Sequence, residues 1–213
     1  MLEEVAERYA EKTAIVLGER RLSYAELDEA SNKAGNALIK IGVGKGDRVA
    51  MLLPNSPEFV IIYFGIVKTG AIAVPLDVGY KVDELAALFD NSQLKVVVTE
   101  SPTLEPLVPA LPRFKSIQHV IDLGSKYGGQ FLSYQEIMTT SSARRIEVGL
   151  EPEDIAHIAY CSGPTLRPRG VMLSHGSITR VAILSGNGFQ QTDKDVVILH
   201  ALPMHYAFGL VVL

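Results

Sequence analysis

Hydrophobic and polar positions between residues 23 and 41 follow the spacing of an amphipathic helix. Apolar residues recur three and four positions apart from Leu27 to Ile41. Ser23 is a favourable N-cap with Glu26 three residues later, which is the spacing of a capping box, and Gly42 ends the pattern. The stretch therefore predicts a helix with one face buried in a core.

Beyond this helix, short apolar runs alternate with longer helical patterns. Runs at 48–54, 71–76 and 94–100 are apolar at nearly every position, as expected for strands buried on both faces. Helical patterns at 56–70 and 81–92 separate them. This strand and helix order, with short connections, predicts an α/β fold with a mostly parallel β-sheet flanked by helices.

The remaining segments give a coarser prediction. Residues 13–24 predict a hairpin, and residues 101–116, which carry four prolines, predict further α/β units without clear boundaries. A helix capped by Ser174 or His175 is predicted late in the chain. Further strands are predicted at 153–160, 170–175 and 196–202.

The chain ends in the stretch "AFGLVVL", in which six of seven residues are apolar. An apolar element of this kind has to be buried by something that follows it. The sequence is therefore expected to be part of a longer protein. An unfinished sheet edge or apolar patch would also give the piece a route to self-association.

Composition narrows the class of protein. With 47% hydrophobic and 21% charged residues, the chain has the balance of a soluble globular protein. Its net charge of −4, with Lys and Arg scattered, argues against nucleic-acid binding. The chain has no run of about 20 apolar residues, as a membrane span needs, and no signal-peptide pattern. With a single cysteine, Cys161, these features favour a cytoplasmic protein.

The stretch "YCSGPTLRPRGVMLSH" at 160–175 has the residue types of a phosphate-binding loop between two predicted strands. Such loops need small residues, free backbone N–H groups, hydroxyls and a cation. The residues that supply these types are Ser162, Gly163, Thr165, Arg169 and Gly170. By composition alone, a simple turn that connects two strands explains the same letters.

Four stretches together resemble the N-terminal part of the adenylate-forming enzymes, which include acyl-CoA synthetases, luciferases and the adenylation domains of peptide synthetases. In order they are "LSYAELDEASNKAGNAL", "GVGKGDRVAMLLPNSPEFVIIYFGIVKTGAIAVPLD", "YCSGPTLRPRGVMLSH" and "LPMHYAFGL". The resemblance covers 6–213 and implies that residues 1–213 are the N-terminal part of the large AMP-binding domain. It also implies activation of a carboxylic acid by ATP with Mg²⁺ through an acyl-adenylate, followed in most members by transfer to CoA.

The resemblance assigns the loop at 162–170 to the β- and γ-phosphates of ATP, but the loop departs from the family pattern. Pro164 stands where the family has Ser or Thr, which removes a hydroxyl and a backbone N–H. Leu166 replaces a glycine and Arg169 replaces a lysine, while Cys161 for Thr or Ser is the mildest change. ATP binding weaker than that of a typical member is therefore expected.

The last motif, "LPMHYAFGL", resembles the family segment that lines the carboxylate pocket. This implies a role in acid binding for His205, Tyr206, Phe208 and Gly209. Tyr206 aligns with a position that is commonly His, with His205 one position earlier, so a slip of one residue would exchange their roles. The alternative is that both residues only cap and pack the last helix.

The other histidines and the cysteine are weaker candidates for a functional site. His157, in an apolar strand, is expected to be a core histidine with its hydrogen bonds satisfied. His119 and His200 have no spacing that suggests a metal site, and Cys161 is expected to be a small buried residue.

The sequence therefore predicts the N-terminal part of an ATP-dependent acid:CoA ligase that acts on a fatty or aromatic acid. By the resemblance, the adenine-binding segment and the C-terminal domain with its catalytic lysine have no counterpart here, so the isolated chain is expected to be inactive. Two alternatives stay open: a fragment of a peptide-synthetase adenylation domain, and a non-catalytic binding module with an altered phosphate loop.

Overall fold

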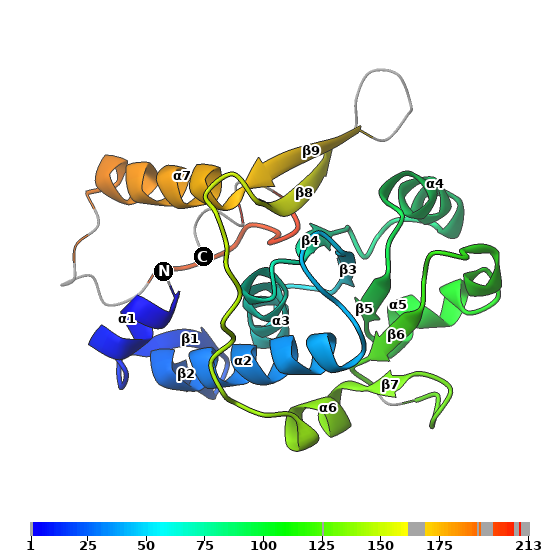
Figure 1. Ribbon diagram of the computed structural model, residues 1–213, viewed down its shortest axis with the longest axis horizontal. Coiled ribbons are helices and arrows are strands. Elements are labelled where there is room, and N and C mark those ends of the chain that lie inside the picture. The colour runs from blue at the N-terminus through cyan, green and yellow to red at the C-terminus, as the bar shows by residue number, and fades with distance from the viewer. Residues whose placement is uncertain are drawn as a thin grey trace.

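A computed structural model of the chain describes residues 2–124, 126–161, 169–190, 192, 198–206 and 209, and of Cys161 it describes the backbone. Helices lie on both faces of a central sheet (Figure 1). The elements in chain order are α1 (Leu2–Arg8), β1 (Thr13–Leu17), β2 (Arg20–Ser23), α2 (Tyr24–Lys40), β3 (Arg48–Leu52), α3 (Pro57–Lys68), β4 (Ile72–Pro75), α4 (Val82–Ser92), β5 (Val96–Thr99), α5 (Ser101–Leu107), the 3-10 turn η1 (Leu111–Arg113), β6 (His119–Asp122), β7 (Leu132–Ser133), α6 (Tyr134–Thr140), β8 (Ile155–Cys161), β9 (Arg169–Ser174) and α7 (His175–Gly188).

Within the described residues the sheet has seven strands in the order β7-β6-β5-β3-β4-β8-β9. Every neighbouring pair is parallel except β8 and β9, which form an antiparallel pair at one edge. The predicted α/β fold with a mostly parallel sheet is therefore confirmed. The hairpin of β1 and β2 is also confirmed and forms a separate two-stranded sheet.

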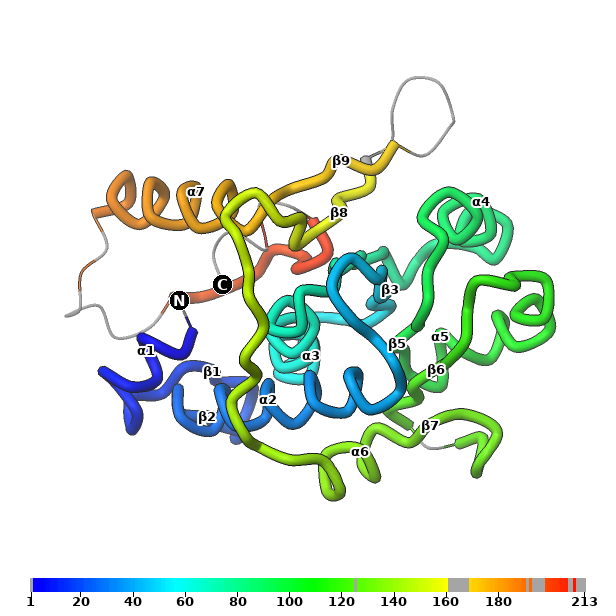
Figure 2. The backbone as a smooth tube through the Cα atoms, in the orientation of Figure 1, coloured from blue at the N-terminus to red at the C-terminus, as the bar shows by residue number. Residues whose placement is uncertain are grey.

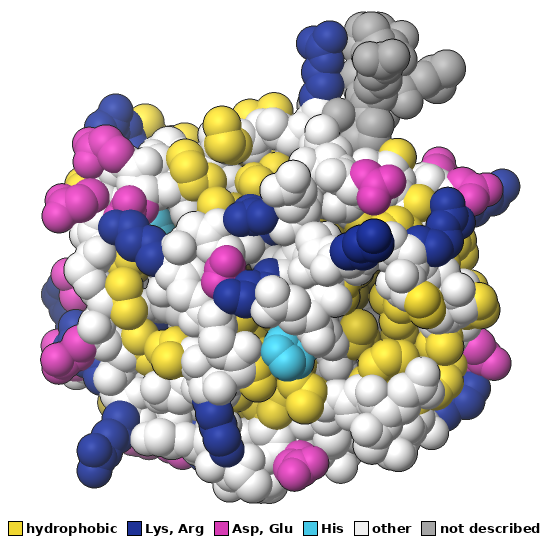
Figure 3. Space-filling model, turned by 45° about the vertical axis from the view of Figure 1, so that its right-hand side comes forward, with side chains coloured by type: hydrophobic (Ala, Val, Ile, Leu, Met, Phe, Trp, Pro, Cys, Tyr) yellow, Lys and Arg dark blue, Asp and Glu magenta, His cyan; other side chains and the backbone are white. Residues whose placement is uncertain are grey.

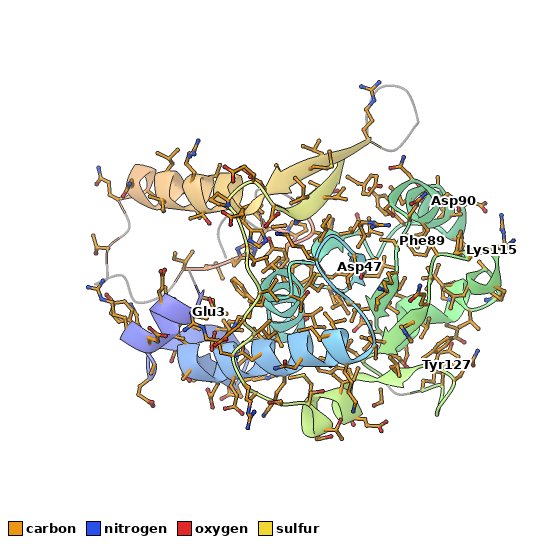
Figure 4. All side chains as sticks on the ribbon, viewed as in Figure 1. Glu3, Asp47, Phe89, Asp90, Lys115 and Tyr127 are labelled. Atoms are coloured by element: carbon orange, nitrogen blue, oxygen red, sulfur yellow. The ribbon has the colours of Figure 1, made fainter. Side chains whose placement is uncertain are left out.

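The core has one apolar cluster on each face of the sheet. On one face α3 lies between the strands and α2, which explains why its sequence is apolar on nearly all sides. On the other face α4 and α5 cover β3, β4 and β5. Figure 4 shows Phe89 pointing from α4 toward the sheet, whereas the next residue, Asp90, is exposed.

The predicted helix starts are confirmed at atomic detail. The Ser23 side chain accepts a hydrogen bond from the Glu26 N–H, and the Glu26 carboxylate accepts one from the Ser23 N–H, which completes the capping box. Of the two caps considered for α7, Ser174 is the one that forms, since its hydroxyl accepts from the Ser177 N–H.

Residues 141–154 run as an extended segment past α2 and α3 and deliver the chain to β8 (Figure 2). The Asn36 side chain donates hydrogen bonds to the carbonyls of Ser142 and Arg144, at 2.9 and 2.8 Å. Further along, Lys45 lies 2.5 Å from the carboxylate of Asp154. These contacts fix the long connection from α6 to β8, the strand that pairs with β4.

One predicted element is wrong in its described part. The strand expected at 196–202 does not form at 198–202, where the backbone pairs with no described strand and Leu199 is 91% exposed. Its apolar composition suggested burial, but a strand also needs a neighbour to accept its backbone hydrogen bonds. Residues 196 and 197 lie outside the described residues.

Charge is mixed over the visible surface. Figure 3 shows basic and acidic side chains interspersed on the face turned toward the viewer. In the part of the chain that the structure describes, no helix has the length and hydropathy to cross a membrane.

Candidate functional site at the carboxyl edge of the sheet

The parallel strands end at one edge of the sheet, and polar residues follow three of them. Asn55 follows β3, Asp77 follows β4, and the loop predicted to bind phosphate follows β8. In open α/β sheets the ligand site lies outside the carboxyl ends of the strands. The described end of β8, after which the predicted loop begins, therefore lies at the edge where a ligand is expected.

The loop itself is described only at its ends. Ser162, Gly163 and Thr165, with Pro164 and Leu166, lie outside the described residues. Arg169 and Gly170 open β9, where the backbone of Arg169 pairs with Cys161 and Gly170 pairs with Tyr160. The loop thus joins two adjacent antiparallel strands, as its position between two predicted strands implied.

Gly170 is required by packing. A Cβ at this position would lie 2.7 Å from Ile158 Cγ2 and 3.3 Å from Tyr160 Cζ, so the absent side chain makes room for side chains of the neighbouring strand. The Tyr160 hydroxyl in turn donates to Asn91 Oδ1 at 2.7 Å. A contact between Gly170 and phosphate stays a prediction.

The second predicted motif lies at the same edge. The Asn55 side chain donates to the carbonyl of Leu202 at 2.8 Å and accepts from the N–H of Met204 at 2.9 Å. His205 follows directly, with Nε2 3.5 Å from Asp77 Oδ2, and its ring lies 4.3 Å from the ring of Tyr206. The motif is thereby attached to the ends of β3 and β4.

The remaining residues of this motif are Tyr206, Phe208 and Gly209, and they differ in burial and in whether the structure describes them. Tyr206 is 51% exposed. Gly209 is buried, and a Cβ there would lie 2.2 Å from the carbonyl oxygen of Pro203, so the position requires glycine for close backbone contact. Phe208 lies outside the described residues. A direct contact of any of these residues with an acid stays a prediction.

The electrostatics of the site centre on His205 and Asp77. Burial lowers the pKa of the His205 imidazole, and the negative charge of Asp77 opposes this effect. The Nε2 atom of His205 is buried and has no hydrogen-bond partner within the described structure at the usual distance. A buried imidazole nitrogen next to a carboxylate can change its protonation state or bind a ligand at little structural cost.

His157 differs from its prediction in one respect. It is buried in β8, as expected, but neither ring nitrogen has a hydrogen-bond partner among the described residues. Its surroundings include the ring of Tyr63, 6.1 Å away between centroids. Burial lowers the pKa of His157 to about 4, so the neutral ring is the stable form in the fold.

Among the described residues, no group of three or more His, Cys, Asp or Glu side chains is arranged to hold a metal ion. The side chain of Cys161 lies outside what the structure describes.

Sequence reasoning missed Asn55 and Asp77. Each follows a buried strand within three residues, at the end where parallel strands meet ligands. Their position just after a buried strand could have identified them as candidate site residues. Their contact partners lie more than a hundred residues away in sequence, so only the fold brings them together.

Both ATP and Mg²⁺ are implied by the resemblance, and the described residues bear on the fit of ATP. Arg169 supplies a cation where the loop enters β9, and guanidinium groups bind phosphate oxygens well. The residue types of this edge, a cation beside a loop with small and hydroxyl residues, suit a polyphosphate.

Comparisons with known proteins agree with this geometry. A model of the family described as "AMP-binding enzyme" matches residues 2–213. Crotonobetaine/carnitine–CoA ligase of Salmonella paratyphi A is 32% identical over 206 residues, covering 92% of this chain and 40% of that protein. Tyrocidine synthase 1 of Brevibacillus parabrevis is 30% identical over 203 residues, covering 94% and 17%.

Among solved structures, ATP-bound MatB from Rhodopseudomonas palustris superimposes with a TM-score of 0.83 at 30% identity, covering 95% of this chain and 39% of that one. The chain thus spans less than half the length of each of these relatives.

Proposed function

Because the chain belongs to the AMP-binding, adenylate-forming enzyme family, we propose that it is the N-terminal part of an ATP-dependent acid:CoA ligase that activates a fatty or aromatic acid. The observation that supports this most directly is that the end of β8, where the loop motif begins, and residues 203–206 of the second motif both lie at the carboxyl edge of the sheet. A cytoplasmic location is part of the proposal.

The residues of this chain would divide the work between two ligands. Arg169 and the loop before it would hold the phosphates of ATP, and His205 with Tyr206 would contact the acid. When bound, ATP with Mg²⁺ supplies the activated phosphorus that converts a carboxylate to an acyl-adenylate, with pyrophosphate as leaving group. The acyl group would then pass to CoA.

The experiment is a pyrophosphate-release assay on two samples. One is the 213-residue chain and the other is the longest product of its gene, each with ATP, Mg²⁺ and either octanoate or benzoate. We expect acid-dependent release from a longer product and none from the chain alone. Release from the chain would overturn the expected inactivity, and no release from a longer product with either acid would overturn the proposed activity.

A peptide-synthetase adenylation domain is the alternative within the same family. The similarity to tyrocidine synthase 1 supports it, since its 30% identity is close to the 32% of the CoA ligase. A carrier domain with an attachment serine downstream in the gene would decide for this alternative. Acyl transfer to free CoA would decide against it.

A non-catalytic binding module is the alternative from a different class. The residues that favour it are Pro164 and Leu166, which replace a hydroxyl residue and a glycine of the family loop. Titration of the purified protein with ATP separates the two, because a module of this kind would lack the nucleotide affinity that a ligase needs.

A further inference from the structure

His205 is held in place from three directions. Its backbone belongs to the segment that Asn55 anchors to the end of β3. Its ring lies against the ring of Tyr206, and its Nε2 atom faces Asp77 at 3.5 Å. The side chain of His205 is only 13% exposed, so these contacts define one orientation of the imidazole.

The carboxylate of Asp77 is oriented as well. Its Oδ1 accepts a hydrogen bond from the N–H of Gly79 at 2.8 Å, which leaves Oδ2 as the oxygen beside the imidazole. A carboxylate next to one ring nitrogen keeps the proton on that nitrogen and so selects the tautomer. At 3.5 Å the contact between Nε2 and Asp77 is electrostatic rather than a hydrogen bond, and it favours the Nε2-protonated tautomer, in which Nδ1 is the unprotonated nitrogen.

Resting on the proposed acid-binding role of this segment, we propose that Asp77 is a positioning residue that holds His205 as the Nε2-protonated tautomer, so that Nδ1 binds the carboxylate of the acid. Binding takes up one proton from solvent at Nδ1. The imidazolium then donates Nε2–H to Asp77 and Nδ1–H to the ligand, so that one proton accompanies each bound anion.

The charges around the ring determine the direction of this coupling. Among the described residues, the titratable groups recorded against His205 are the Asp77 carboxylate and the Tyr206 ring. Burial lowers the pKa of His205 and Asp77 opposes that effect. A second carboxylate at Nδ1 acts in the same direction as Asp77, so acid binding is expected to raise the pKa of His205.

The test uses ¹⁵N NMR of the histidine rings in the 213-residue chain, with the His205 signals assigned by their loss in His205→Gln. The probes are sodium benzoate and sodium octanoate, and benzyl alcohol is the neutral control. Asp77→Asn keeps an oxygen for the Gly79 N–H but removes the charge. Asp90→Asn, at an exposed position of α4, is the matched control.

We expect the Nε2-protonated tautomer in the wild-type chain and in Asp90→Asn, and its loss or mixing in Asp77→Asn. Benzoate is expected to raise the pKa of His205, benzyl alcohol to leave it unchanged, and Asp77→Asn to weaken benzoate binding about 10-fold, the effect of one charge-assisted contact. An Nδ1-protonated ring, or benzoate bound with the pKa of His205 unchanged, would overturn this inference alone. An Nε2-protonated ring with no binding of either acid would instead overturn acid binding at this segment, and with it the proposed function of the motif.

Discussion

Gly65 of α3 lies directly against Gly35 of α2. A Cβ built at Gly65 would stand 3.0 Å from the backbone nitrogen of Gly35 and 2.8 Å from Ala34 Cβ, and a Cβ at Gly35 would stand 2.7 Å from the Gly65 carbonyl oxygen. The two helices therefore meet backbone to backbone. This contact sets the spacing of the helix layer over β3 and β4, the strands whose ends carry Asn55 and Asp77.

Gly65→Ala is expected to destabilise the fold by about 1–3 kcal/mol, because the added methyl group forces two packed backbones apart. The gain in helix propensity from glycine to alanine opposes this by up to about 1 kcal/mol. The matched control is Gly188→Ala at the end of α7, where a Cβ meets nothing within 4 Å. Urea unfolding of both variants measures the difference, and equal midpoints would contradict the close contact.

A second prediction concerns Lys68, a cation buried where α1, α2 and α3 meet. Its side chain is 5% exposed, and its ammonium group donates to Asp28 at 2.6 Å and to Asn32 at 2.8 Å. Lys68→Met removes the cation beside the Asp28 carboxylate and leaves it only the hydrogen bond from the Asn32 amide. A loss of about 2–3 kcal/mol is expected, below the value for a fully buried pair because Asp28 is 21% exposed.

The control for Lys68 is Lys126→Met, which breaks the exposed pair of Lys126 with Glu105. Exposed ion pairs add little because solvent screens them, so thermal unfolding of this variant should match the wild type. The prediction fails if both lysine variants unfold at the same temperature.

Local patterns in the sequence were sufficient for the elements from β1 to β5. The capping box of Ser23 and Glu26 was predicted correctly, and Ser174 was one of the two caps predicted for α7; both features depend on residues three positions apart. The strand expected at 196–202 failed in its described part because a strand depends on a neighbour that local composition does not reveal.

The candidate site was only half predictable for a similar reason. The sequence motifs identified the loop that follows β8 and the segment at 203–209 as candidate site residues. The contacts of Asn55 with Met204 and of Asp77 with His205 were not predicted, because they join residues far apart in sequence. The unsatisfied ring of His157 was also hidden, since a histidine in an apolar strand has the same sequence pattern with or without partners.

The third prediction uses His157 and the pH dependence of stability. Because burial lowers the pKa of His157 to about 4, from an ordinary value of 6.5, the unfolded chain binds a proton at this residue before the folded chain does. The stability from the neutral ring is fully present above pH 6.5 and is lost as the pH falls toward 4. The shift corresponds to about 3 kcal/mol over that window.

His157→Leu removes the titrating group and both unpartnered nitrogens, so its stability should fall less than that of the wild type between pH 6.5 and 4. His119→Gln, at a half-buried position of β6, is the control and should keep the pH dependence of the wild type. Guanidinium unfolding at pH 7, 5.5 and 4.5 provides the measurement. Parallel curves for wild type and His157→Leu would show that another group controls acid stability.

The fourth prediction concerns the altered phosphate loop. The substitutions Pro164→Thr and Leu166→Gly, which restore residues typical of the family, are expected to strengthen ATP binding. The first returns a hydroxyl and a backbone N–H, and the second allows close approach of the backbone to phosphate. Isothermal titration of the longest gene product with Mg-ATP measures the affinity. Arg169→Ala in the restored loop should reverse part of the gain, and an unchanged affinity in the double variant would contradict the assignment of these positions.

The fifth prediction tests the attachment of the acid-binding segment to the sheet. The N–H of Met204 donates to Asn55 Oδ1, so Asn55→Ala exposes that amide to exchange with solvent. Hydrogen exchange at Met204 should accelerate in this variant, and the Nε2-protonated tautomer of His205 should be lost with it. Asn36→Ala is the control, because it removes an asparagine that likewise bridges two backbone groups, the Ser142 and Arg144 carbonyls, on a different face. Acceleration at Met204 in Asn36→Ala as well would show general loosening of the fold, whereas slow exchange in both would show that Asn55 does not hold the segment.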